Sequence, residues 1–108
     1  MRLKIIYAPE VYADLQHAID FYNSRQKGLG TRFFKTVKIQ ISKIKSNAFG
    51  FQVRYNDVRC LPLIKFPYTI HYKPFSETNT IKIIAIFCDY LDPETWDDRW
   101  NKNDLNEE

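Results

Sequence analysis

Two stretches of helical periodicity, separated by a pair of glycines, constrain the fold of this chain more than any other feature. From Pro9 to about Arg25, apolar residues recur every three or four positions at Val11, Leu15, Ala18, Ile19 and Tyr22. The second stretch repeats this spacing at Phe33, Val37, Ile41 and Ile44, and the period ends near Asn47. A helix with one apolar stripe has to bury that stripe against another element. Because Gly28 and Gly30 permit a sharp reversal between the stretches, the pattern predicts an antiparallel helical hairpin.

Strand-like sequence flanks the predicted hairpin on both sides. Residues 3–7 predict a strand before it, and from residue 51 onward β-branched and aromatic residues predict a sheet, with reversals at 56–57 and 74–79. Residues 80–88 are apolar on both faces from Ile83 onward, which predicts an interior strand covered on both sides. Asp92 as N-cap and Pro93 in the first turn then predict a last short helix carrying Trp96 and Trp100.

Together these elements predict an α+β fold. It comprises an N-terminal strand, the antiparallel helical hairpin, a mostly antiparallel twisted sheet and a short C-terminal helix. We expect one domain over residues 1–108, with a flexible tail after about residue 101.

The charges of the chain are unevenly distributed. Sixteen Lys and Arg residues stand against 13 Asp and Glu, a formal net charge of +3. Cations greatly outnumber acids from Lys27 to Lys82, whereas acids are concentrated from Asp89 to Glu108. This asymmetry fits a basic face for nucleic acid or for an acidic protein segment, and it equally fits an ordinary solvated surface.

The spacing of the cysteines and histidines and the length of the apolar runs exclude several classes of protein. The two cysteines, Cys60 and Cys88, and the two histidines, His17 and His71, are too far apart for a zinc spacing, so we expect no metal and no cofactor. Residues 1–6 are too short and too charged for a signal peptide, and no apolar run is long enough to span a membrane. We therefore expect a cytoplasmic protein without a membrane partner.

Short motifs follow one another in a recognisable order along the chain. The hairpin region contains Ala13-Asp14-Leu15, residues 18–22, and Gly28-Leu29-Gly30 with Arg32-Phe33; the sheet region contains Arg54-Tyr55, Val58-Arg59, Phe66-Pro67-Tyr68 and Ile70-His71-Tyr72, followed by Asp92-Pro93 and Trp96. In this order and spacing, the chain resembles the RelE/ParE superfamily of toxins from bacterial type II toxin–antitoxin pairs, the plasmid stabilisation proteins. The resemblance implies a growth inhibitor that a cognate antitoxin masks. RelE-like members cleave ribosome-bound mRNA, whereas ParE-like members lack that catalytic set and inhibit DNA gyrase.

Three residues are candidates for RNA cleavage. Cleavage through the 2′-hydroxyl requires a base, cations for the phosphorane and an acid for the leaving oxygen. The resemblance implies that Arg59 contacts RNA, and its planar fork suits phosphate. His71 is the natural base or acid because its ordinary pKa is near neutrality, and Tyr90 is a candidate to stack on a base or donate a proton. Each has a structural alternative: a surface arginine paired with a carboxylate, a packed histidine, and a tyrosine covering the sheet.

Four further cations are candidates for binding a nucleic acid or another target. They are Arg54, Lys65, Lys73 and Lys82. Alternate residues of a strand share a face, so these cations join Arg59 in one basic patch if the strand order places them side by side on the same face. If it does not, they are separate surface charges.

The chain departs from the family pattern at the end of its last predicted strand. Many members place a histidine and then an arginine there, whereas this chain has Cys88 and Leu91, with Asp89 and Tyr90 between them. The missing pair favours the ParE-like, gyrase-directed and non-hydrolytic branch. Three alternatives stay open: a RelE-like ribosome-dependent mRNA endoribonuclease, a degenerate toxin that only binds its antitoxin, and a small RNA-binding domain. Whether the protein is an enzyme is therefore left open.

Overall fold

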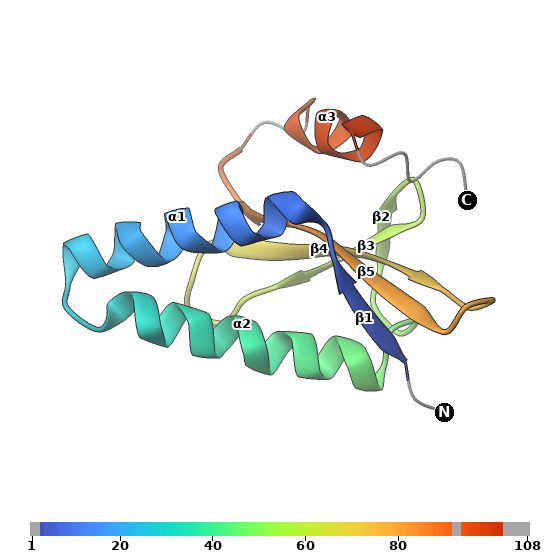
Figure 1. Ribbon diagram of the computed structural model, residues 1–108, viewed down its shortest axis with the longest axis horizontal. Coiled ribbons are helices and arrows are strands. Elements are labelled where there is room, and N and C mark those ends of the chain that lie inside the picture. The colour runs from blue at the N-terminus through green and yellow to red at the C-terminus, as the bar shows by residue number, and fades with distance from the viewer. Residues whose placement is uncertain (1–2, 92–93, 103–108) are drawn as a thin grey trace.

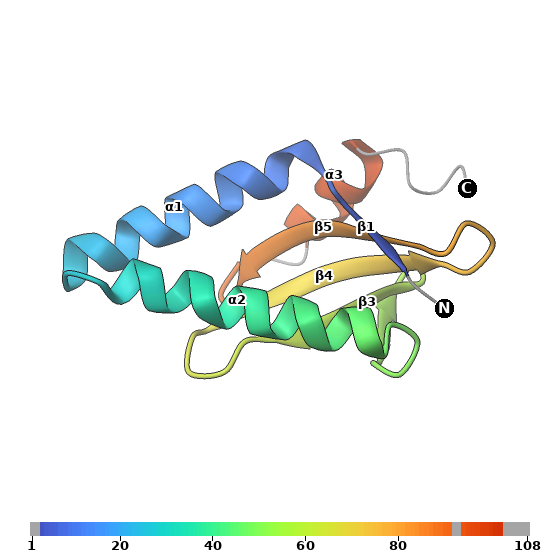
Figure 2. The same cartoon turned by 60° about the horizontal axis from the view of Figure 1, so that its bottom comes forward.

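A helical hairpin lies across one face of a five-stranded sheet, and a short third helix lies on the opposite face (Figures 1 and 2). The structure is a computed structural model that describes residues 3–91 and 94–102. Its elements are, in chain order, β1 (Lys4–Tyr7), α1 (Pro9–Arg25), α2 (Leu29–Ser46), β2 (Val53–Tyr55), β3 (Val58–Pro62), β4 (Tyr68–Phe75), β5 (Thr80–Cys88) and α3 (Glu94–Lys102). The predicted α+β class, helical hairpin and C-terminal helix are confirmed.

The sheet has the strand order β1-β5-β4-β3-β2. β1 runs parallel to β5, and the other pairs are antiparallel, as the sequence predicts for most of the sheet. β5 lies between β1 and β4, and its residues from Ile83 to Phe87 are buried. The prediction of an interior strand covered on both sides is therefore confirmed.

Strand alternation divides the buried residues into two clusters. On the side of α1 and α2, which we call the hairpin face, the core includes Ile70, Tyr72 and Ile83. On the side of α3, which we call the α3 face, a smaller cluster is formed by Val58, Ile84, Ala85 and Phe87, with Tyr55, Phe75 and Trp96 packed against it. Successive residues of a strand point to opposite faces, so the cluster to which a residue belongs also gives the orientation of its neighbours.

A β-bulge in β5 interrupts this alternation. His71 of β4 pairs with Ala85, but the next residue, Tyr72, pairs with Ile83, so Ile84 has no opposite partner. A bulge inserts one extra residue and bends the strand. Ile84 and Ala85 consequently both pack in the α3-face cluster, although they are adjacent in sequence.

The two glycines of the hairpin have different roles. Gly28 has φ 87°, in the left-handed region where only glycine is free of strain. Gly30 lies where α2 approaches α1: its amide donates to Asn23 Oδ1 at 2.8 Å, and a Cβ there would lie 2.3 Å from the Ile19 carbonyl oxygen. The reversal predicted at Asn56-Asp57 is also present, with both residues at positive φ.

Some predictions for the C-terminal region lie outside the described residues. These are Asp92 as N-cap, Pro93 in the first turn and the tail from residue 103 onward. α3 begins at Glu94, and Trp96 packs in the α3-face cluster as an anchor for this helix. Among the described residues, no helix combines the length and the apolar character needed to cross a membrane.

Candidate functional site

A pocket of about 280 Å³ lies on the α3 face and brings together two of the predicted site residues, Arg54 and His71. Its other lining residues are Cys60, Thr69, Phe87, Cys88, Asp89 and Trp96, so β2, β3, β4, the end of β5 and α3 contribute to it. We call it the α3 pocket. It combines aromatic rings with one cation and one carboxylate, a composition suited to binding a small polar group.

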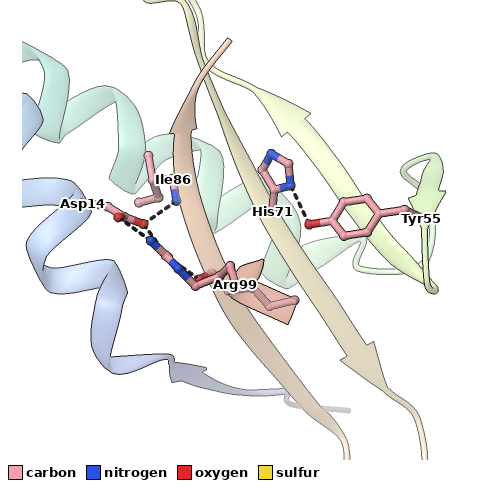
Figure 3. Close-up of polar contacts among 6 residues, drawn as sticks. Asp14, Tyr55, His71, Ile86 and Arg99 are labelled. Atoms are coloured by element: carbon pink, nitrogen blue, oxygen red, sulfur yellow. Dashed lines mark hydrogen bonds and ion pairs between the residues drawn. The ribbon is translucent and has the colours of Figure 1, made fainter. Parts of the chain in front are cut away.

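His71 lines the α3 pocket and is only 1% exposed. Its Nδ1 is hydrogen-bonded to the Tyr55 hydroxyl at 3.0 Å (Figure 3), and its ring packs edge-on against Trp96 and Phe87. Burial, with the charges of Arg54 and Arg99 adding to it, lowers the pKa of His71 to about 4. At neutral pH the ring is therefore uncharged and a weak base, with the properties of a packed histidine.

Cys60 forms a pair with His71 that the sequence reasoning did not find. The two residues are opposite each other on β3 and β4, and the sulfur lies 3.6 Å from Nδ1. Burial raises the pKa of the Cys60 thiol to about 11, against a smaller lowering by Arg54. A nucleophilic cysteine needs the thiolate, and a protonated histidine is what stabilises it. Here the thiol stays protonated and the imidazole neutral, so this pair is not an activated nucleophile.

The charged groups of the pocket come from its rim. Arg54 is exposed on β2, and Asp89 follows β5, where its carboxylate accepts a 2.6 Å hydrogen bond from the Thr69 hydroxyl. The indole Nε1 of Trp96 is buried and has no hydrogen-bond partner among the described residues. An exposed cation and an unused N–H donor can both hold an anionic or carbonyl group. The carboxylate of Asp89 opposes a full negative charge in the same pocket.

Arg59 lies on the other side of the sheet from the α3 pocket. It pairs with Tyr72, whose ring belongs to the hairpin-face core. Its Nη1 donates to the carbonyl oxygens of Phe51 at 2.6 Å and Phe49 at 3.2 Å, in the loop between α2 and β2. The Tyr72 hydroxyl donates to Ala48 in the same loop. Arg59 therefore holds this loop in place, and no carboxylate partner of it is found in the described part of the chain.

The remaining predicted residues lie in separate places. Lys73 and Lys82 are opposite each other on β4 and β5, on the α3 face but outside the pocket. Lys65 is exposed in the turn between β3 and β4, at φ 69°. Tyr90, just beyond β5, is 84% exposed.

Of the two alternatives for Arg54, Arg59, Lys65, Lys73 and Lys82, the structure favours separate charges over one basic patch. The structure brings only Lys73 and Lys82 together, and it places Arg59 and Arg54 on opposite faces. The physical reason is strand parity: the sequence shows that cations are frequent but not which residues of neighbouring strands share a face.

An ion pair between Asp14 and Arg99 joins α1, β5 and α3, and sequence reasoning missed it as well. The guanidinium contacts the carboxylate through two nitrogens at 2.9 and 3.0 Å and also donates to the Ile84 carbonyl oxygen. Asp14 accepts a further bond from the Ile86 amide (Figure 3). β1 ends at Tyr7, opposite Ile83, so these side chains satisfy the β5 backbone where β1 no longer covers it.

An apolar groove of about 430 Å³ runs between α1 and α2 and is lined by Tyr7, Tyr12, Leu15, Gln16, Ile19, Phe34, Val37, Lys38 and Ile41. We call it the hairpin groove. Tyr12 is 63% exposed and Phe34 is 37% exposed there. Exposed aromatic rings beside an apolar groove are typical of surfaces that bind another protein.

The sequence matches no known protein-family model and no curated protein. The fold does match a solved structure, the chromosomal ParDE TA system from P. aeruginosa, with a TM-score of 0.69. The match covers 79% of this chain and 94% of the other, at 17% sequence identity. The protein thus shares its fold with a chain of that ParDE TA system, which confirms at the level of the fold the resemblance seen in the sequence.

Proposed function

We propose that this protein is the toxin of a type II toxin–antitoxin pair, and that it inhibits growth by a ParE-like, non-hydrolytic action on DNA gyrase. The observation that carries the proposal is the likeness of the fold, over 79% of this chain, to the ParDE toxin–antitoxin structure. The proposed setting is the bacterial cytoplasm, where both the antitoxin and the gyrase are found.

The chemistry of the candidate residues supports the non-hydrolytic branch. A ribonuclease of this type needs a base of suitable pKa close to a cation that binds the scissile phosphate. The pKa of His71 is lowered to about 4, and Arg59 is engaged by loop carbonyls on the opposite face. Cys88 and Leu91 hold the places where many family members have histidine and arginine. No catalytic role is therefore proposed for Arg59, His71 or Tyr90.

The hairpin groove supports a protein partner. Its walls are apolar and two of its aromatic rings are exposed, so an amphipathic antitoxin segment that orders on binding would bury surface now in contact with water. We propose that the cognate antitoxin binds here.

Inducible expression of the full chain in bacteria tests the function. Expression alone is expected to stop growth, with loss of supercoiling activity of gyrase and intact mRNA; normal growth would exclude a toxin. Cleavage of mRNA in the ribosomal A site would instead assign the RelE-like activity.

A substitution in the hairpin groove tests whether the antitoxin binds there. Tyr12→Glu is expected to leave growth arrest intact and to prevent rescue by the co-expressed neighbouring gene product, because a buried carboxylate would face the apolar segment. Val53→Glu, at a position 43% exposed on β2, is the matched control and should be rescued normally. Equal rescue of both variants would remove the groove from the antitoxin interface.

A further inference from the structure

The segment between Asp20 and Asp57 contains no acidic residue. The same interval has eight cations: Arg25, Lys27, Arg32, Lys35, Lys38, Lys43, Lys45 and Arg54. It includes the whole of α2, whose last turn contains Lys43 and Lys45. A run of like charges without any counter-charge favours a polyanionic partner.

The fold concentrates part of this charge on the outer side of α2. One shallow groove of about 660 Å³ is lined by Lys35, Lys38, Ile39, Ser42, Lys43 and Ser46. A second groove of about 680 Å³ lies between α2 and the β3–β4 turn, and it is lined in part by Arg32, Lys35 and Lys65. The grooves share Lys35 and Ile39, so they form one continuous surface. We call its five cations, Arg32, Lys35, Lys38, Lys43 and Lys65, the α2 basic face.

These cations are available to a partner. All five are exposed, and none forms an ion pair with a carboxylate among residues 3–91 and 94–102. Lys38 contacts the Phe34 ring, 4.8 Å from its centre, which leaves its ammonium accessible. Such a cluster of unpaired like charges repels itself, and an anion on it relieves that repulsion.

We propose that the α2 basic face binds the phosphate backbone of a nucleic acid without reading its bases. From Arg32 to Lys43 the helix advances about 16 Å at 1.5 Å per residue. One strand of a duplex carries about five phosphates over that length. Lysine, a point charge with three rotatable donors, contacts phosphate without regard to sequence.

An acidic protein segment fits this surface less well. Lysine is depleted at protein interfaces, whose centres are formed by aromatic and other large apolar anchors. The first groove offers only Ile39 as an apolar side chain, between three lysines and two serines. The second groove is more apolar, with Tyr22 and Phe66 among its lining residues, but its cations line it together with them. The exposed rings of Tyr12 and Phe34 lie in the hairpin groove, which meets the α2 basic face at Lys38. This inference does not depend on the proposed toxin function.

Fluorescence anisotropy with purified full-length protein tests the proposal. The probe is a labelled duplex of mixed sequence, about 20 base pairs long, titrated over a range of salt concentrations. We expect a Kd of about 10⁻⁶ to 10⁻⁴ M near physiological salt, the same for unrelated sequences. Lys35→Gln with Lys43→Gln should weaken binding equally for all sequences and reduce the slope of log K against log salt by about 2.

The matched control is Lys73→Gln with Lys82→Gln, which removes the same charge from the α3 face and should leave the salt slope unchanged. Circular dichroism melts verify that both double variants fold. Equal losses in the two variants, or a loss in the control alone, would overturn the proposal. Tighter binding of a polyglutamate peptide of equal charge would also overturn it, because the partner would then be an acidic protein segment. The assay involves no growth measurement, so its result is separate from that of the toxicity test.

Discussion

The Arg59 guanidinium donates hydrogen bonds to backbone carbonyl oxygens, whereas the sequence suggested an exposed side chain that binds phosphate. Its two hydrogen bonds join β3 to the loop after α2, and its buried Nε has no partner among the described residues. Hydrogen bonds from a charged donor stabilise more than neutral ones, and the carbonyls left behind lose a partner.

We therefore predict that Arg59→Ala lowers the free energy of unfolding by about 2 kcal/mol. The measurement is urea denaturation, in which the midpoint should fall while the slope stays unchanged. Arg59→Lys, which keeps the charge and one donor, should lose less. If Arg59→Ala were as stable as the wild type and yet lost toxicity, the functional role first assigned to Arg59 would be correct.

His71 makes stability depend on pH. Its pKa is about 4 in the folded protein, below the ordinary value of 6.5, because burial disfavours the charged ring. The unfolded chain then binds more protons between these values, so stability is complete above pH 6.5 and is lost as the pH falls towards 4. The loss between about pH 7 and about pH 5 should be about 2 kcal/mol from this residue.

Urea denaturation at both pH values measures this difference. In His71→Phe, which keeps an aromatic ring but cannot titrate, most of the pH dependence should disappear even though the hydrogen bond between Tyr55 and residue 71 is lost. His17→Gln alters the other, exposed histidine and should keep the wild-type dependence. A His71→Phe variant with unchanged pH dependence would show that folding does not lower the pKa of His71.

At the scale of elements, the Asp14–Arg99 pair connects three segments that are distant in the sequence. Both side chains are mostly buried, at 13% and 15% exposed. Removing one partner of such a pair leaves a desolvated charge, which costs more than the pair contributes. α3 has little other apolar contact with the sheet in its described part, mainly through Trp96.

We predict that Asp14→Ala lowers the free energy of unfolding by about 3 kcal/mol and speeds hydrogen exchange of the Ile86 amide. Asp20→Ala, on the exposed side of the same helix, removes an equal charge and should change stability by less than about 0.5 kcal/mol. Similar effects of the two substitutions would mean that α3 is held by other contacts.

Elements whose limits depend on local sequence could be predicted. α1 begins at Pro9 and ends at Arg25 as expected, because helical periodicity and the glycine reversal are local properties. The contact of Cys60 with His71 depends on the register of β3 and β4 across the Leu63–Pro67 turn. That register follows from turn geometry and core packing, and neither is visible in the spacing of residues.

For the α3 pocket, the local sequence pattern identified the types of the candidate residues but not the face of the sheet on which each lies. Arg54 and His71 do share a pocket, whereas Arg59 was separated from them by strand alternation. The bulge at Ile84 was also unpredictable, because an extra residue in a strand leaves no consistent mark in an apolar run.

At the scale of the whole molecule, the sheet separates the α3 pocket from two adjoining surfaces, the hairpin groove and the α2 basic face. The helical hairpin lies on one face of the sheet and α3 on the other (Figures 1 and 2). The α3 pocket is therefore on the opposite side of the sheet from the hairpin groove and the α2 basic face. The excess of cations from Lys27 to Lys82 was evident in the sequence. That five of these cations share the outer side of α2 and the β3–β4 turn became clear only from the packing of that helix.

Asp14 and Arg99, which bond to the backbone of β5, also affect whether another copy of this protein can add a strand to the sheet. Beyond Ile83, the backbone of β5 would otherwise present an amide and a carbonyl to any extended chain. Asp14 and Arg99 occupy both groups and place paired charges at that border. A neighbouring molecule cannot add a strand there without breaking the ion pair, so this part of the sheet is protected against edge-to-edge aggregation.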